Sequence, residues 1–273
     1  MKRPDFFIVG AFKAGTTALY EYLGQHPQVF MPFHKEPMYF GADLDPRYAR
    51  MSERDYLRLF AEARPDQRVG EASPWYLYSR TAAGEIKDFS PEAQIIVMLR
   101  NPVDVMHAQH SQLLFNQREE ISDFAAALAA EDDRRAGRRI PAGALRREAF
   151  FYRDSVRFSG QLARYFDVFG RERVHVIVFD DLRVDAASVV RSTFAFLGVD
   201  PEHPVDLAAR NPNRRVRLAA VQRLVYRPPG LLKRLVPTLR RLPLVHRLRD
   251  AVVAANSAAQ AREPMDPELR RQL

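Results

Sequence analysis

A glycine-bounded turn near the N-terminus constrains the fold more than any other stretch of the sequence. Residues 10–17 read GAFKAGTT, and the apolar residues 5–9 before them are typical of a buried strand. Apolar residues then recur at helical spacing from Ala18 to Leu23, and Gly24 marks the end of this helix. A strand, a glycine-rich loop and a helix in this order favour anion binding, because free backbone N–H groups and the positive end of the helix dipole point into the loop.

The spacing of this turn is close to the phosphate loop of nucleotide triphosphatases, but it differs in one position. That loop has the form GxxxxGK[ST], with its lysine directly after the second glycine. Here Thr16 takes that place, and Lys13 lies inside the loop. The turn alone therefore leaves two interpretations open: an anion-binding loop, or an ordinary strand-to-helix turn with a solvated lysine.

Strand-like and helix-like segments alternate from residue 5 to residue 198. The clearest strand is Gln94–Leu99 (QIIVML), an apolar run typical of a parallel strand buried on both faces. The alternation predicts an α/β fold, a P-loop-like three-layer structure with a central parallel sheet flanked by helices. Ligands bind beyond the carboxyl ends of such strands, so Gly10 and Arg100 are expected to face one ligand. Further strands are expected at 29–31, 68–74 (running into a loop) and 174–179, and helices at 52–60, 102–116, 123–139, 150–166 and 189–197.

Several polar segments carry expectations of their own. Residues 123–139 are predicted to start as a helix and to become an exposed, Arg- and Gly-rich stretch. Residues 180–182 are expected to cap the helix that follows. Residues 211–217 are expected to form a basic loop that leads into short helices interrupted by prolines, and a last helix is expected to begin within 265–271.

The positive charge of the chain is concentrated in one region. The net charge is +8, and residues 205–250 contain 12 Lys and Arg against 2 Asp, which gives +10 there and −2 for the remainder. Such a region indicates an anionic ligand, a membrane surface or nucleic acid.

The composition also limits the cellular compartments and the kinds of functional site that can be expected. No apolar run approaches the roughly 18–20 residues of a membrane span, and the apolar segment after Arg3 is too short for a signal peptide, so a cytoplasmic protein is expected. The absence of cysteine excludes disulfides and thiolate nucleophiles. The seven histidines are scattered without metal-ligand spacing, so no metal site is expected.

Four features occur together along the chain: Lys13 within the loop, Lys35-Glu36-Pro37 in a crossing loop, Arg100-Asn101-Pro102 after a buried strand, and a late arginine loop. Together they resemble the sulfotransferases that use 3′-phosphoadenosine 5′-phosphosulfate (PAPS), most of all the branch of the heparan sulfate sulfotransferases and their bacterial relatives. The similarity extends from Phe6 to about Phe196. It implies PAPS as the donor, the bisphosphate PAP as the product and no metal. It also implies a catalytic core at 1–213, with 214–273 as a basic loop and helical extension of the same domain.

The resemblance assigns a role to each part of the turn. Lys13 would contact the bridging oxygen of the donor and offset negative charge as the nucleotide leaves. The residues after it would hold the 5′-phosphate through backbone N–H and hydroxyl groups. These residues are Ala14, Gly15, Thr16, Thr17 and Ala18.

The resemblance also assigns catalytic roles to the crossing loop. Glu36 matches the family's glutamate base, which would take a proton from the acceptor. From the residues alone, Glu36 is equally well interpreted as a solvated glutamate before a proline. Lys35 matches a lysine that the family places in the same cleft, and a supporting catalytic role is expected for it.

The residues that the family uses to bind the 3′-phosphate end of the donor are matched less completely in this chain. Arg100 matches the family's arginine on the 3′-phosphate, and a guanidinium fork suits that ligand. The family usually has a serine eight residues later, where this chain has Ala108, and Ser111 one turn further is the expected substitute. Arg214 and Arg215 fall where the family has a basic loop over the 3′-phosphate; a solvated charge cluster is the alternative.

The acceptor is expected between residues 35–40 and 73–78. Trp75, Tyr76 and Tyr78 are interpreted as core residues or as walls of this acceptor site. Ala72 stands where heparan-type members often carry a lysine, which argues against a polyanionic acceptor.

The function predicted from the sequence is in-line transfer of a sulfuryl group from PAPS to a hydroxyl or amine of a carbohydrate, lipid or small metabolite. One alternative is a P-loop kinase or nucleotide-binding protein, although the lysine position and the lack of a clear magnesium-binding aspartate count against it. Another alternative is a basic membrane-surface or nucleic-acid binding protein built on residues 205–250.

Overall fold

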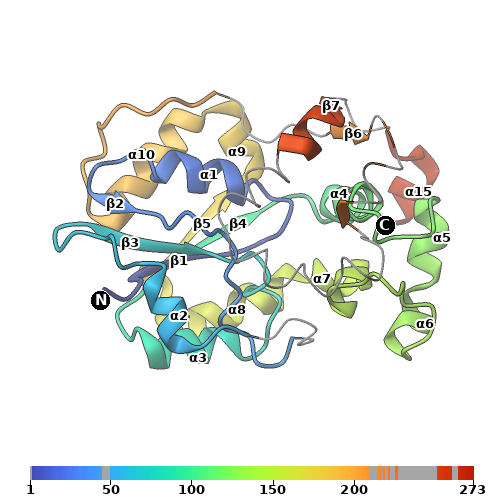
Figure 1. Ribbon diagram of the computed structural model, residues 1–273, viewed down its shortest axis with the longest axis horizontal. Coiled ribbons are helices and arrows are strands. Elements are labelled where there is room, and N and C mark those ends of the chain that lie inside the picture. Colours follow the sequence, from blue (N-terminus) through green and yellow to red (C-terminus); the bar gives the residue numbers. More distant parts are fainter. Residues whose placement is uncertain are drawn as a thin grey trace. The chain divides into compact units, whose positions relative to one another are not determined.

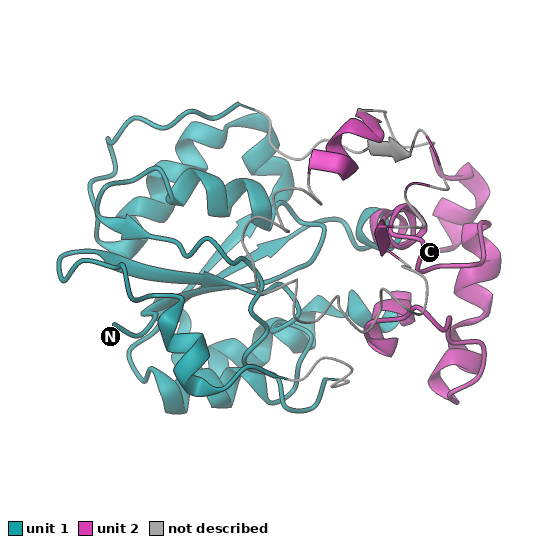
Figure 2. Cartoon of the chain, in the orientation of Figure 1, with its two compact units in different colours: residues 1–106, 153–211 teal, residues 107–152, 212–273 magenta. Residues whose placement is uncertain are grey.

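The structure is a computed structural model that describes residues 2–44, 50–208, 214–216, 218, 221, 225–226, 251–259 and 264–273 (Figure 1). The chain forms two compact units, shown in teal and magenta in Figure 2. Residues 1–106 and 153–211 form the first unit, and residues 107–152 and 212–273 form the second. The division into a core at 1–213 and an extension at 214–273 stays a prediction.

A parallel sheet forms the centre of the first unit. Within the described residues it has five strands in the order β2-β3-β1-β4-β5, and every neighbouring pair is parallel. This confirms the predicted α/β fold. The strands are β1 (Phe6–Gly10), β2 (Val29–Phe30), β3 (Arg68–Ala72), β4 (Gln94–Leu99) and β5 (Val174–Val178).

The strands at the centre of the sheet are buried because both of their faces are covered. Every residue of β1 is buried, and the four central residues of β4 are buried as well. In the register, Phe6 lies beside Gly70 of β3 and Gln94 of β4. The carboxyl ends of β3, β1 and β4 therefore meet at one edge of the sheet, where the connecting loops begin.

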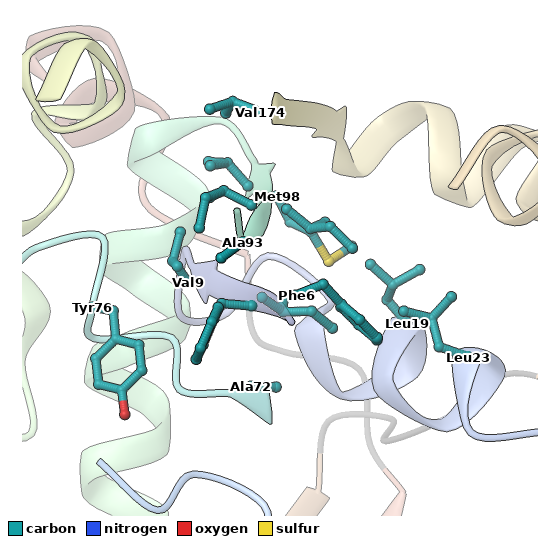
Figure 3. Packing of buried hydrophobic residues seen from close by; sticks show 14 of the residues in the cluster. Phe6, Val9, Leu19, Leu23, Ala72, Tyr76, Ala93, Met98 and Val174 are labelled. Carbon is teal, nitrogen blue, oxygen red and sulfur yellow. The ribbon is translucent and has the colours of Figure 1, made fainter. Parts of the chain in front are cut away.

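Helices cover both faces of the sheet and complete the three layers. One face carries α1 (Thr16–Leu23), α9 (Phe179–Val184) and α10 (Ala186–Leu197), and the other carries α2 (Glu53–Arg58), α3 (Ala82–Phe89) and α8 (Phe158–Phe169) (Figure 1). Figure 3 shows Leu19 and Leu23 of α1 packed toward Phe6 of β1, with Tyr76 on the other side of the strand. Burial of such side chains stabilises the fold by roughly 1.5–3 kcal/mol each.

Two details of the first unit differ from the sequence predictions. The single helix expected at 150–166 is wrong: α7 (Tyr152–Ser155) ends before α8 begins at Phe158, and Gln161 Nε2 donates to the Ser155 carbonyl oxygen at 3.1 Å. The cap expected at 180–182 is also misplaced. Those residues lie inside α9, and the cap of α10 is Asp185, whose side chain accepts a hydrogen bond from the Ser188 N–H at 2.9 Å.

The second unit is mainly helical in the residues that the structure describes. Its elements include α5 (Phe124–Ala129), α6 (Glu131–Arg135), the 3₁₀ helix η1 (Arg147–Phe150), the antiparallel pair β6 (Arg214–Val216) and β7 (Ser257–Ala259), and α15 (Pro267–Gln272). Helix α4 (Pro102–Phe115) begins in the first unit and continues into the second, and the 3₁₀ helix η2 (Arg171–Arg173) belongs to the first.

Two predictions for the second unit need correction. The 123–139 stretch is not exposed throughout, because Arg134 is completely buried and donates two hydrogen bonds to Glu119. Residues 214–216, expected within a loop, form strand β6 because their backbone pairs with β7. The remaining residues of the expected loop, 211–213 and 217, and most of the proline-interrupted helices lie outside the described residues. No described helix is both long enough and apolar enough to span a membrane.

Candidate active site

The turn at residues 10–17 connects the carboxyl end of β1 to the amino end of α1. Gly15 is the N-cap residue of α1, has a left-handed φ of 93°, and leaves the first turn without a side-chain cap. A Cβ atom on Gly15 would lie 3.0 Å from Phe179 Cδ2, and one on Gly10 would lie 2.6 Å from Leu77 Cβ. Glycine is therefore required at both positions. Anion binding by the turn stays a prediction.

Arg100 lies against this turn, directly after β4. Its Nη1 atom donates a hydrogen bond to the Lys13 carbonyl oxygen at 3.3 Å, and its Cζ atom lies 4.6 Å from the centre of the Phe179 ring. Asp104 is 4.0 Å from its Nη2 atom. The Ala11 N–H also donates to the Met98 carbonyl oxygen at 2.6 Å, which fixes the turn to β4. The structure thus places the Arg100 guanidinium on the backbone of the turn at Lys13.

The crossing loop that contains Lys35 and Glu36 is attached to the end of β3. The Glu36 N–H donates to the Ala72 carbonyl oxygen at 3.1 Å, and the Met38 N–H donates to Ser73 Oγ at 3.1 Å. The Lys35 Nζ atom lies 2.6 Å from Glu36 Oε1, and the two side chains are 18% and 44% exposed. The carboxylate of Glu36 is therefore accessible and has a cation beside it.

The end of β3 is in turn attached to β1, just before the turn. The Ser73 N–H donates to the Ile8 carbonyl oxygen at 3.2 Å, and the Leu77 N–H donates to the Val9 carbonyl oxygen at 2.8 Å. The Lys35 Nζ atom lies 6.0 Å from the centre of the Tyr20 ring on α1. The crossing loop and the turn are thus held by neighbouring strands at one edge of the sheet.

In these two loops the backbone adopts left-handed conformations that residues other than glycine rarely take. The φ angles are 59° at Lys13, 61° at Glu36 and 53° at Met38. Such positions cost on the order of 1–3 kcal/mol each and occur mostly at active sites and ligand clamps. The observation supports a functional role for both loops.

Residues 47–203 match the model of the "Sulfotransferase family". A solved sulfotransferase from Alicyclobacillus acidocaldarius is 34% identical, covers 90% of this chain and 97% of its own, and superposes with a TM-score of 0.70. The chain belongs to the sulfotransferase family. This confirms the resemblance that the sequence motifs indicated.

Curated sulfotransferases are similar over a shorter stretch. The membrane-associated sulfotransferase kil1 of Dictyostelium discoideum is 30% identical over 39% of this chain and 22% of its own length. Human heparan sulfate glucosamine 3-O-sulfotransferase 6 is 34% identical over 41% of this chain and 31% of its own length. The chain therefore spans less than a third of these curated relatives.

The remaining residues predicted for this sulfotransferase-family site belong to the second unit. Ser111 lies on α4, where its Oγ atom donates to the His107 carbonyl oxygen at 2.9 Å, and Ala108 on the same helix is buried. Arg214 and Arg215 lie in β6. The contact of Ser111, Arg214 and Arg215 with the 3′-phosphate stays a prediction.

The aromatic residues after β3 divide into two groups. Tyr76 is a core residue: it is completely buried, and its hydroxyl oxygen accepts the Tyr39 N–H at 2.8 Å. Trp75 stacks on Phe12 of the turn with ring centres 4.5 Å apart, and Tyr78 donates to Asp154 Oδ2 at 2.7 Å. Trp75 therefore packs against the turn through Phe12.

Two residues close to the turn or the crossing loop were not identified from the sequence. Phe179 packs under Gly15 and against Arg100, but in the sequence it reads as the last residue of an apolar strand. Glu71 is completely buried at the end of β3, and burial raises the pKa of its carboxyl group to about 7. Its only signal is a single acidic residue within the strand RVGEA.

Proposed function

We propose that this protein transfers the sulfuryl group of PAPS to a hydroxyl or amine of an acceptor by in-line displacement. The observation that carries the proposal is the hydrogen bond from Arg100 to the Lys13 carbonyl oxygen, since it puts a guanidinium group beside an anion-binding turn. An elongated donor with a phosphosulfate at one end and a 3′-phosphate at the other fits this pair of groups.

The turn has the features that such a donor requires. Gly15 leaves the first turn of α1 uncapped, so its N–H groups and the hydroxyls of Thr16 and Thr17 are suited to hold the 5′-phosphate. Lys13 supplies a cation that offsets the charge on the bridging oxygen as the sulfur–oxygen bond breaks. Arg100 supplies the fork for the 3′-phosphate.

Glu36 is the proposed base. It accepts the proton of the acceptor as the acceptor oxygen or nitrogen bonds to sulfur, while the electron pair of the broken bond stays on the nucleotide phosphate. Its accessible carboxylate and its attachment to the end of β3 support this role. Lys35, which is 2.6 Å from Glu36, is proposed to support the negative charge of the transferring group.

The acceptor is proposed to be a carbohydrate, a lipid or a small metabolite that enters beside residues 35–40 and 73–78. Relatives named as heparan sulfate and carbohydrate sulfotransferases support a carbohydrate. Action in the cytoplasm, without a metal, is part of the same proposal, and residues 214–273 are proposed to complete the donor site.

Radioactive PAPS incubated with cell extract tests the reaction. Lys13→Ala is expected to reduce label transfer by about 10²–10³-fold, and Glu36→Gln by about 10²–10⁴-fold. Lys87→Ala, at a half-buried lysine on α3, and Glu62→Gln, at an exposed glutamate, are controls outside the two loops and are expected to retain full transfer. Full activity of Lys13→Ala would refute the mechanism.

A binding measurement separates this function from that of a kinase. Adenosine 3′,5′-bisphosphate is expected to bind more tightly than Mg–ATP, and Arg100→Ala is expected to weaken the bisphosphate. Tighter binding of Mg–ATP by the wild type would favour the kinase alternative.

A further inference from the structure

The single tryptophan of the chain, Trp75, lies against the turn at residues 10–17. Its ring stacks on that of Phe12, with the ring centres 4.5 Å apart and an angle of 14° between the planes. Trp75 is 9% exposed and Phe12 is 5% exposed, so water has little access to either residue. Connecting segments normally lie on the surface. A turn residue as buried as Phe12 is therefore one that its neighbours cover.

Neighbouring residues hold Trp75 in place. Tyr78 meets the Trp75 ring edge-on, with ring centres 5.9 Å apart, and donates its hydroxyl to Asp154 Oδ2 at 2.7 Å. The backbone just after Trp75 is attached to β1, because the Leu77 N–H donates to the Val9 carbonyl oxygen at 2.8 Å. This backbone attachment does not involve the indole ring, so substitutions of the Trp75 side chain are expected to keep the fold.

Phe12 directly precedes Lys13, whose backbone conformation needs support from its surroundings. The φ angle of Lys13 is 59°, and a left-handed conformation at a residue other than glycine persists only where neighbouring contacts hold it. One contact follows from Arg100, whose Nη1 atom donates to the Lys13 carbonyl oxygen at 3.3 Å. The other is the stack of Trp75 on Phe12. The backbone is thus held both at Lys13 and at the residue before it.

We propose that Trp75 is a positioning residue for the transfer reaction: by stacking on Phe12, it holds Lys13 in the backbone conformation from which the lysine acts on the donor. The inference rests on the proposed function, because that function assigns Lys13 to the bridging oxygen of PAPS. Trp75 acts through Phe12, and a contact of its own with the donor is not required.

The first measurement is independent of activity. Because Trp75 is the single tryptophan, the tryptophan fluorescence of the whole protein reports on this one ring. Phe12→Leu is expected to shift the emission to longer wavelength and to increase its quenching by acrylamide, since the uncovered face of the indole ring meets water. Phe60→Leu removes another buried phenyl ring of the same unit and is expected to keep the wild-type emission. Unchanged emission in Phe12→Leu would overturn the inference.

The second measurement separates kcat from KM. Trp75→Leu is expected to lower kcat by about 10- to 100-fold, because a small displacement of a catalytic group has effects of this size. The KM for PAPS is expected to change by no more than about threefold, since an interaction made mainly in the transition state is lost. Trp75→Phe keeps a ring that can stack on Phe12 and is expected to retain kcat within about threefold of the wild type. Equal losses of kcat in the two variants would contradict the inference.

The third measurement tests whether Trp75 acts through Lys13. When Trp75→Leu is added to Lys13→Ala, transfer is expected to fall by no more than about twofold, because the group that Trp75 positions is already absent. A purely structural role would instead lower transfer by the same factor in both backgrounds, and that result would overturn the inference. Phe60→Leu is expected to lower the thermal stability but to leave transfer unchanged in both backgrounds, which separates destabilisation from positioning.

The design also separates failure of the inference from failure of the proposed function. Circular dichroism checks that Trp75→Leu is folded; if it is not, Phe12→Leu, which removes the other half of the stack, takes its place in the same cycle. A wild type that transfers no sulfuryl group from PAPS refutes the proposed function, and the role of Trp75 is refuted with it. Equal losses in both backgrounds, in a protein whose wild type does transfer, refute the role of Trp75 alone.

Discussion

Glu71 and Glu119 are both buried glutamates bonded to a buried tyrosine, one in each unit, and they differ in everything else around the carboxylate. Glu119 accepts hydrogen bonds from Arg134 at 2.8 and 2.9 Å and from the Tyr152 hydroxyl at 2.8 Å. Two backbone N–H groups, at residues 120 and 121, donate to it as well. Glu71 accepts the Tyr56 hydroxyl on one oxygen, and its other oxygen has no hydrogen-bond partner among the described residues, although the nearby hydroxyls of Ser73 and Tyr76 also lower its pKa.

The pKa values of the two glutamates differ because their hydrogen-bond partners differ. Burial alone would raise the pKa of Glu119, but its hydrogen bonds and the charge of Arg134 outweigh burial and lower it below its usual value. At Glu71 burial prevails, and the pKa rises to about 7. A fully paired carboxylate is a fixed structural charge, whereas an incompletely paired one changes its charge near neutral pH. The second kind lies in β3, next to Ala72, whose carbonyl oxygen accepts the Glu36 N–H of the crossing loop.

The largest expected effect comes from breaking the complete pair. Arg134→Met leaves Glu119 buried without its cation and is expected to lower the free energy of unfolding by about 3–5 kcal/mol. Urea denaturation measures it. Arg138→Ala removes an exposed partner of Asp133 and serves as the control, with no measurable change expected. A small effect of Arg134→Met would mean that the two glutamates are more alike than their contacts indicate.

Opposite pH dependences of stability form the next test. The pKa of Glu71 is raised, so the folded state binds more protons than the unfolded state between pH 4.5 and about 7, and stability falls by on the order of 3 kcal/mol over this range. Glu71→Gln does not titrate and so lacks this loss. The difference in free energy of unfolding between Glu71→Gln and the wild type is therefore expected to shift in favour of the variant as the pH rises from 5 to 8.

The pKa of Glu119 is lowered, so its contribution is present above the unfolded value and is lost as the pH falls through the folded one. Glu119→Gln is therefore expected to be most destabilised at neutral pH, and its deficit is expected to shrink below about pH 4.5. Urea denaturation of both variants beside the wild type measures the two trends. Parallel trends for the two glutamates would break the comparison.

The smallest expected effect concerns the two tyrosines. Tyr152→Phe is expected to cost about 1 kcal/mol at pH 7, where Glu119 is ionised, and Tyr56→Phe about the same at pH 8 but less at pH 6, where Glu71 is protonated. Thermal denaturation at both pH values detects the difference. A pH-independent cost for Tyr56→Phe would show that its hydroxyl does not sense the charge of Glu71.

Much of the fold was readable from the sequence, because its strongest signals are local. The apolar run predicts strand β4, and the glycines predict the turn at 10–17, without reference to distant residues. Gly24 by itself predicts the end of α1. The break between α7 and α8 was missed because the apolar spacing continues through it. The conformation there depends on the Gln161 side chain, which no periodicity reveals.

Glu71 and Arg134 could not be interpreted from the sequence, because their properties come from distant residues. Arg134 lies in a segment rich in arginine and looks exposed until Glu119 and Tyr152 are placed around it. The pKa of Glu71 depends on Tyr56, Tyr76 and Lys35, which only the folded sheet brings together. Lys13, Glu36 and Arg100 could be proposed because each lies in a family motif beside a turn or strand end, and their roles stay predictions.

The contact between Arg100 and the Lys13 carbonyl oxygen also has a consequence for protein engineering. The loop GAFKAGTT is not an independent module, since its backbone contacts the guanidinium group of Arg100, directly after β4, and the ring of Phe179 lies against Gly15. A graft of the loop onto another α/β scaffold should carry Arg100 and Phe179 with it. A substitution at Arg100 would also remove the hydrogen bond to the Lys13 carbonyl oxygen and so affect the backbone of the turn.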